Sequence, residues 1–70
     1  MYYQNKITAI LESRNIEANP RHVEAWMRSE YSPFDHISAT KFTKAVIDAA
    51  TSIAALGDAF GEKLAQSYGI

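Results

Sequence analysis

The sequence predicts an all-α fold, a compact bundle of three to four short helices that self-associates, formed by residues 1–70 as a single domain. Three observations lead to this prediction. Apolar residues recur with helical spacing in several segments, no stretch of useful length alternates between polar and apolar residues, and no Asn-Gly hairpin signal occurs. Residues typical of helix ends separate the segments, so each segment is expected to be one helix.

The first helix is predicted near the start of the chain. Its apolar residues are spaced i, i+4, i+7 and i+8, and they are Tyr3, Ile7, Ile10 and Leu11. The pattern stops at Arg14-Asn15, where arginine suits the negative end of a helix and asparagine tolerates the left-handed conformation of a C-cap. We expect Ile16 to fold back onto this helix end.

The second helix is predicted to begin at Asn19-Pro20, because asparagine is a strong N-cap and proline fits the first helical position. One side of this helix is apolar, with Val23, Trp26, Met27 and Tyr31. The outer side is predicted to carry Arg21, Glu24 and Arg28, with a favourable i,i+4 pair between the last two. Ser32-Pro33 is expected to end the helix, since the residue before proline avoids helical geometry.

A third helix is predicted to start after a connector whose Phe34 and Ile37 plug the core, with Ser38 as N-cap and Ala39 at the first position. It carries an apolar stripe with the four-three alternation of a helix that packs along another helix. The stripe residues are Phe42, Val46, Ala49, Ile53, Leu56 and Phe60.

Gly57 leaves two alternatives for the rest of the chain. In one, Gly57 ends the third helix and Asp58 caps a separate last helix; in the other, one long helix runs from about Ala39 to Ser67. The unbroken phase of the stripe favours continuity. The two glycines at positions 57 and 61 favour a break, since each costs about 0.8–1.0 kcal/mol relative to alanine inside a helix. We expect the break.

Size and composition limit the classes of function. A chain of 70 residues forms one domain at most, and such a small domain commonly depends on disulfides, metals or oligomerisation for stability. Cysteine is absent, which leaves self-association as the first expectation. The formal net charge of −1 predicts weak long-range attraction to nucleic acid or anionic lipid. With no secretory signal or membrane span in the sequence, we expect a cytoplasmic protein.

Enzymatic chemistry has little support in the sequence. The two histidines, His22 and His36, lack the short-spaced ligand pairs of a metal site, so His22 is interpreted as a surface residue of a first helical turn. No serine lies in a nucleophile-elbow motif, and three isolated glycines cannot form a phosphate-binding loop. We therefore expect no catalytic residue, no metal and no cofactor.

Two interaction hypotheses remain. The first is a protein–protein interaction module, most simply a homodimer that binds a host or other partner protein. The six stripe residues would form the core of the chain and also a self-association surface. Trp26 and Tyr31 would either lie in the core, which is the default, or anchor a partner protein. The second is a small DNA-binding transcriptional regulator that uses Lys41 and Lys44 at the start of the third helix. The low net charge argues against the second hypothesis, so solvent-exposed helix faces are the simpler interpretation of these lysines.

Part of the chain also resembles small uncharacterised helical proteins of bacterial and phage genomes. The resemblance lies in HVEAWMRSEY at 22–31, FDHIS at 34–38 with Phe42, and the ending EKLAQSYG at 62–69. It implies a compact accessory protein of a phage or mobile element, and it implies no activity. It implies no functional residue.

Overall fold

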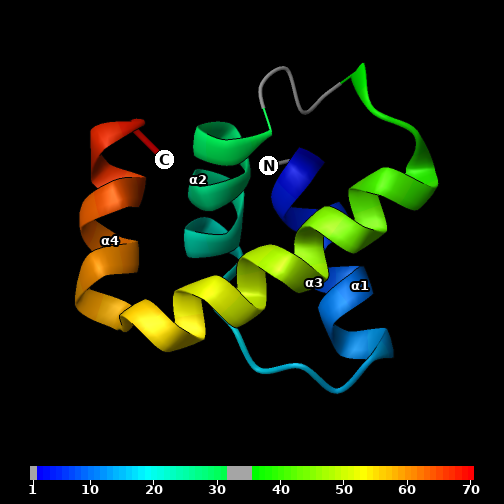
Figure 1. The fold of residues 1–70 in the computed structure, drawn as a ribbon, viewed down its shortest axis with the longest axis horizontal. Coiled ribbons are helices and arrows are strands. Elements are labelled where there is room, and N and C mark those ends of the chain that lie inside the picture. Colours follow the sequence, from blue (N-terminus) through cyan, green and yellow to red (C-terminus); the bar gives the residue numbers. More distant parts are fainter. Residues whose placement is uncertain (1, 32–35) are drawn as a thin grey trace.

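The computed structural model describes residues 2–31 and 36–70, which form four helices and no strand (Figure 1). The helices are α1 (Tyr2–Ser13), α2 (Pro20–Glu30), α3 (Ala39–Leu56) and α4 (Asp58–Ser67). The prediction of a small all-α bundle is confirmed. The predicted helix end at Ser32-Pro33 and the predicted plug at Phe34 lie outside the described residues. No helix in the described ranges combines the length and the apolar character that a membrane crossing requires.

The predicted end of α1 is confirmed as a complete capping motif. Asn15 adopts the left-handed conformation with φ 54°. Its N–H donates to the Glu12 carbonyl at 3.2 Å, and the N–H of Ile16 donates to the Leu11 carbonyl at 3.0 Å. These two bonds are the Schellman pair, which satisfies carbonyls that a helix end would otherwise leave open. Ile16 packs against the core, as predicted.

The starts of α2 and α3 also follow the predicted caps. The Asn19 side chain accepts a hydrogen bond from the Arg21 N–H at 2.9 Å, and Pro20 occupies the first helical position. The Ser38 hydroxyl accepts a hydrogen bond from the Lys41 N–H at 3.2 Å. Each cap satisfies a backbone donor that has no partner inside its helix, and this fixes where the helix begins.

α2 lies at the centre of the bundle and contacts all three other helices. In Figure 1, α4 lies on one side of α2 and α1 lies on the other, while α3 crosses in front of α1 and passes the lower end of α2 to reach the start of α4. The main hydrophobic core fills the space between α1, α2 and α3. Its buried members are Ile7, Leu11, Val23, Met27, Phe42, Ala45, Val46, Ala49 and Ala50. Ile37 packs against this core from the connector, as predicted.

Gly57 separates α3 from α4, so the predicted break is confirmed and the single long helix is not observed. Gly57 has φ 98° and ψ 160°, a conformation that is essentially restricted to glycine. Its N–H donates to the Ile53 carbonyl at 2.8 Å, and its own carbonyl accepts from the Gly61 N–H at 3.1 Å. Asp58 was expected to be the cap of α4, but it occupies the first turn and Gly57 is the N-cap.

We expect Leu11→Ala to lower the free energy of unfolding by about 2–5 kcal/mol, because it leaves a cavity in the core. The matched control is Leu56→Ala, which removes the same atoms from a side chain that is 49% exposed. A change of about 0.5 kcal/mol or less is expected there. Urea denaturation followed by circular dichroism measures both variants, and equal losses would contradict this assignment of the core.

Candidate functional site

The contact between α2 and α4 depends on a residue without a side chain. α4 buries only Gly61 and Ala65. A Cβ atom added to Gly61 would lie 2.5 Å from Nδ1 and 2.7 Å from Cγ of His22, which is closer than atoms can pack. The imidazole of His22 therefore fills the space that a side chain at position 61 would need, and it is only 3% exposed. The interpretation of His22 as a surface residue was wrong, because α4 covers it.

A group of polar contacts joins α4 and the following turn to α2 next to this glycine. Oε1 of Glu62 accepts a hydrogen bond from Nη1 of Arg21 at 2.6 Å and lies 3.1 Å from Nε2 of His22. Nη2 of Arg21 donates to the carbonyl of Ile70 at 2.7 Å. We call these four residues, Arg21, His22, Glu62 and Ile70, the polar clamp. Arg21 was predicted on the outer side of α2, and its partners on α4 and in the following turn were not predicted.

The polar clamp is charged at neutral pH. The hydrogen bond from Arg21, together with a weaker contribution from His22, lowers the pKa of the Glu62 carboxyl to about 2. The same hydrogen bond raises the pKa of Arg21. A carboxylate with such a low pKa is a poor general base near neutral pH. The arrangement is therefore suited to holding two helices together, and salt is expected to weaken it because both charged side chains are partly exposed.

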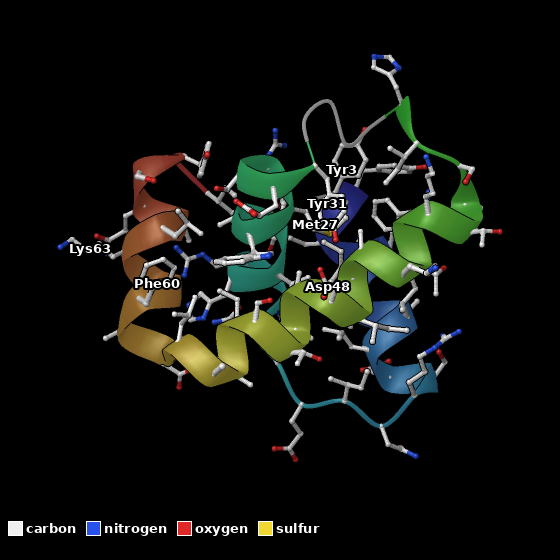
Figure 2. The ribbon with its side chains drawn as sticks, in the orientation of Figure 1. Tyr3, Met27, Tyr31, Asp48, Phe60 and Lys63 are labelled. Carbon is white, nitrogen blue, oxygen red and sulfur yellow. The ribbon has the colours of Figure 1, made fainter. Side chains whose placement is uncertain are left out.

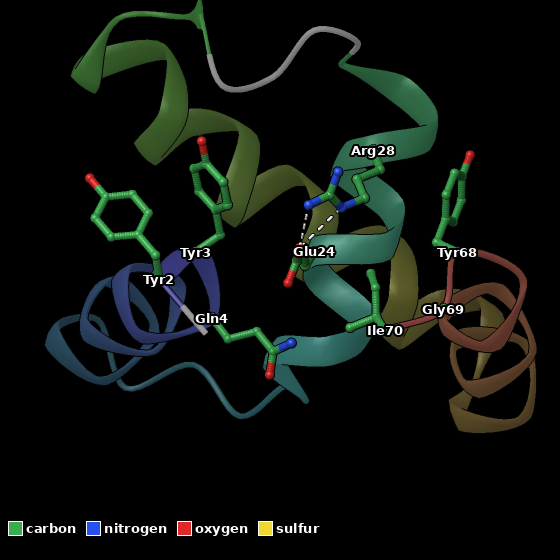
Figure 3. A pocket seen from close by; sticks show the side chains of 8 residues that line it. All are labelled: Tyr2, Tyr3, Gln4, Glu24, Arg28, Tyr68, Gly69 and Ile70. Atoms are coloured by element: carbon green, nitrogen blue, oxygen red, sulfur yellow. Dashed lines mark hydrogen bonds and ion pairs between the residues drawn. The ribbon is translucent and has the colours of Figure 1, made fainter.

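A second ion pair lies between Glu24 and Arg28 on α2. Nε and Nη2 of Arg28 contact the same oxygen of Glu24, Oε2, at 3.0 and 2.9 Å. The predicted i,i+4 pair is confirmed, but its place on the outer side was wrong, because Glu24 is only 6% exposed. The pair borders a cavity of about 390 Å³ in which Tyr2 and Tyr3 face Tyr68 across the pair (Figure 3).

The outer side of α4 carries large apolar residues. Phe60 is 41% exposed, and its ring meets the partly buried ring of Trp26 edge-on, with centroids 6.3 Å apart. Phe60 and Leu64 line a shallow cavity of about 360 Å³ together with Lys63 and Ser67. Figure 2 shows Phe60 on α4 beside α2, with Lys63 reaching outward. We call Trp26, Phe60 and Leu64 the Phe60 surface.

The structure divides the six predicted self-association residues into two groups. Phe42, Val46, Ala49 and Ile53 are buried inside the chain. Leu56 and Phe60 remain exposed. The hydrophobic stripe is therefore mainly an intramolecular packing surface, because α1 and α2 cover its first three turns. Only its last two members are available to a partner while the four helices keep this arrangement.

The other predicted contact residues lie apart from one another. Trp26 belongs to the Phe60 surface, whereas the hydroxyl of Tyr31 donates to Oδ2 of Asp48 on α3 at 2.7 Å (Figure 2). This hydrogen bond raises the pKa of Tyr31. Lys41 and Lys44 are exposed on the first turns of α3. Their contact with nucleic acid stays a prediction.

In the described ranges 2–31 and 36–70, no group of three His, Asp or Glu residues is arranged so that it could hold a metal ion. The residues that the sequence interpretation missed are Gly61 and Glu62 of α4 and their partners on α2. One signal was available, since a glycine inside a helix is unfavourable unless its position requires a missing side chain. The position of Glu62 one residue later carried no signal of its own.

Comparison of the chain with known protein families, with curated proteins and with solved structures gives no match. The resemblance to small helical proteins of bacterial and phage genomes therefore stays a prediction. Function has to be inferred from the contacts and surfaces described above.

We expect Gly61→Ala to lower the free energy of unfolding by about 1–3 kcal/mol, because its Cβ would overlap the His22 ring. In a His22→Gly background, which removes the ring and also the Cβ atom that would lie 3.0 Å away, the same change should raise it by up to about 1 kcal/mol, since alanine is the better helix former. A double-mutant cycle measured by urea denaturation tests this reversal of sign. The same loss in both backgrounds would show that the ring does not restrict position 61.

The polar clamp should make stability depend on pH in the acidic range. The pKa of Glu62 is about 2 in the folded chain and near 4.5 without partners. The ionised Glu62 side chain thus contributes fully to the free energy of unfolding above about pH 5. This contribution is lost as the pH falls towards 2, because the carboxylate is protonated more easily in the unfolded chain. Glu62→Gln removes this charge while keeping the shape of the side chain. We expect the stability difference between wild type and Glu62→Gln to shrink steadily over this range, and a constant difference would refute the role of the charge.

Proposed function

We propose that this chain is a small non-enzymatic protein–protein interaction module that binds a partner protein through the Phe60 surface. The observation that carries the proposal is the orientation of α4. This helix turns Gly61 and Ala65 inward and leaves Phe60 on the outside. An isolated domain is expected to do the reverse, because burying the large apolar side chains of a helix gives the greater stabilisation.

The composition of the Phe60 surface supports a protein partner. Aromatic residues are enriched in the buried centres of protein interfaces, and tryptophan is the most frequent hot spot. Trp26 is partly buried and held edge-on by Phe60, so that a partner would meet two preorganised rings. Lys63 and Ser67 border the apolar residues and supply a polar rim. An accessory role in a phage or mobile element is compatible with such a surface.

A catalytic function has weaker support. In the described part of the chain two of the glutamates are paired with arginines: Glu62 with Arg21, and Glu24 with Arg28. The hydrogen bond from Arg21 lowers the pKa of the Glu62 carboxyl to about 2, far from the intermediate pKa that acid–base catalysis requires. The buried His22 faces a helix backbone and not a cavity. These features favour binding over chemistry.

We expect Phe60→Ser to weaken capture of the partner, and Tyr2→Ser to leave it unchanged. Both side chains are exposed aromatics, but Tyr2 lies on α1, away from the Phe60 surface. Loss of a hot-spot aromatic weakens binding by about 2 kcal/mol or more, about 30-fold in Kd. Affinity capture from extracts of the native cells, followed by mass spectrometry and titration of the purified partner, measures this difference. Equal capture by all three proteins would exclude the Phe60 surface.

A further inference from the structure

α4 lies outside the main hydrophobic core. Neither the buried members of that core nor the apolar residues packed against it come from α4, and all of them precede Thr51. The two buried residues of α4, Gly61 and Ala65, are the smallest that a helix can offer. α1, α2 and α3 therefore enclose their own core, and α4 is added to it as a separate layer on α2.

That layer is joined to α2 by the close packing of Gly61 and Ala65 and by polar contacts. Oε1 of Glu62 accepts a hydrogen bond from Nη1 of Arg21 at 2.6 Å and lies 3.1 Å from Nε2 of His22. Nη2 of Arg21 donates to the Ile70 carbonyl at 2.7 Å. Such contacts are directional and specific, but partly exposed ion pairs stabilise weakly compared with a hydrophobic core. Because α4 supplies no residue to the main hydrophobic core, its exchange would leave that core within each chain.

The joint between α3 and α4 is a single residue, Gly57. Its φ of 98° is compatible with glycine and strained for other residues, although a Cβ there would meet nothing within 4 Å. Rotation of this one residue into helical geometry would join α3 and α4 into one helix. The sequence is compatible with that form, because the spacing from Ile53 through Leu56 to Phe60 keeps its alternation of three and four across the joint.

We propose that two copies of this chain associate by exchanging α4. In each copy α3 and α4 become one continuous helix, and α4 docks on α2 of the other copy through the same polar clamp. The inference goes beyond the proposed function, and the partner that it names is a second copy of this chain. The exchange uses the α2–α4 interface and not the Phe60 surface, so each proposal can fail without the other.

A second copy fits this place on α2 because the requirements are unusual. The occupant needs a residue without a side chain opposite the His22 ring, since a Cβ would lie 2.5 Å from Nδ1. It also needs a carboxylate in the next position to meet Arg21. Gly61-Glu62 satisfies both requirements, and in an exchanged dimer the contacts of α4 with α2 are made again between copies.

Gly57→Ala tests the role of the joint. Alanine disfavours the positive φ of the closed form and favours a continuous helix, so we expect this variant to shift from monomer towards dimer in analytical ultracentrifugation. Gly69→Ala is the matched control, because Gly69 also has positive φ, 69°, and open space around it but does not link two helices. It should not increase the dimer. A monomeric Gly57→Ala protein with intact helical circular dichroism would overturn the proposal.

Charge reversal across the polar clamp tests the exchange itself. In the Gly57→Ala background, Arg21→Glu alone and Glu62→Arg alone each place like charges together, within a chain and between identical copies. After the two variants are unfolded and refolded together, each α4 meets an opposite charge only on the α2 of the other variant. We expect native mass spectrometry to show mixed dimers in clear excess, with a Kd about tenfold or more below that of either variant alone.

The control for mixing is Glu12→Arg with Arg14→Glu, in the same background. Both residues are exposed on or next to α1, away from the polar clamp, so this pair should give mixed and identical dimers in statistical proportion. Statistical proportions for the clamp variants as well would overturn the exchange. That result would leave the Phe60→Ser capture experiment unaffected, since neither reversed residue belongs to the Phe60 surface.

Discussion

The structure depends on α2, a helix that is covered on nearly every side by the other three. Its buried residues therefore meet two kinds of neighbour. Val23 and Met27 enter the hydrophobic core with α1 and α3, whereas His22 packs against the bare backbone of α4 at Gly61. One short helix thus makes an apolar contact with α1 and α3 on one side and a close contact with α4 on the other. The positions of the other three helices are set by these two contacts of α2.

This division explains how a domain of 70 residues without cysteine is organised. So short a chain has little apolar surface to bury, and the core lies among the three helices that come first. The fourth helix packs closely on α2 because Gly61 has no side chain, and Glu62 pairs with Arg21. The hydrogen bond from Arg21 lowers the pKa of the Glu62 carboxyl to about 2. Such contacts specify position well, but they resist salt and acid less than buried apolar residues do.

Local signals predicted most of the fold. The caps at Asn19 and Ser38, the left-handed Asn15 and the break at Gly57 were all identified, because each depends on the chemistry of a few adjacent residues. The charged faces were predicted less well. Glu24 was placed outside although it is buried, since a helical period shows which residues share a face but not how many faces neighbours cover.

The candidate site was missed for the same physical reason. The heptad spacing predicted one continuous contact stripe through Phe60, yet the turn at Gly57 rotates α4 so that Gly61 and Ala65 point inward and Phe60 points outward. A glycine inside a helix was interpreted only as a helix breaker. It also marks a position where the backbone must approach another group, and here that group is an imidazole ring. Because the inward positions are the small ones, the large apolar side chains of α4 remain available for a contact that the isolated chain does not make.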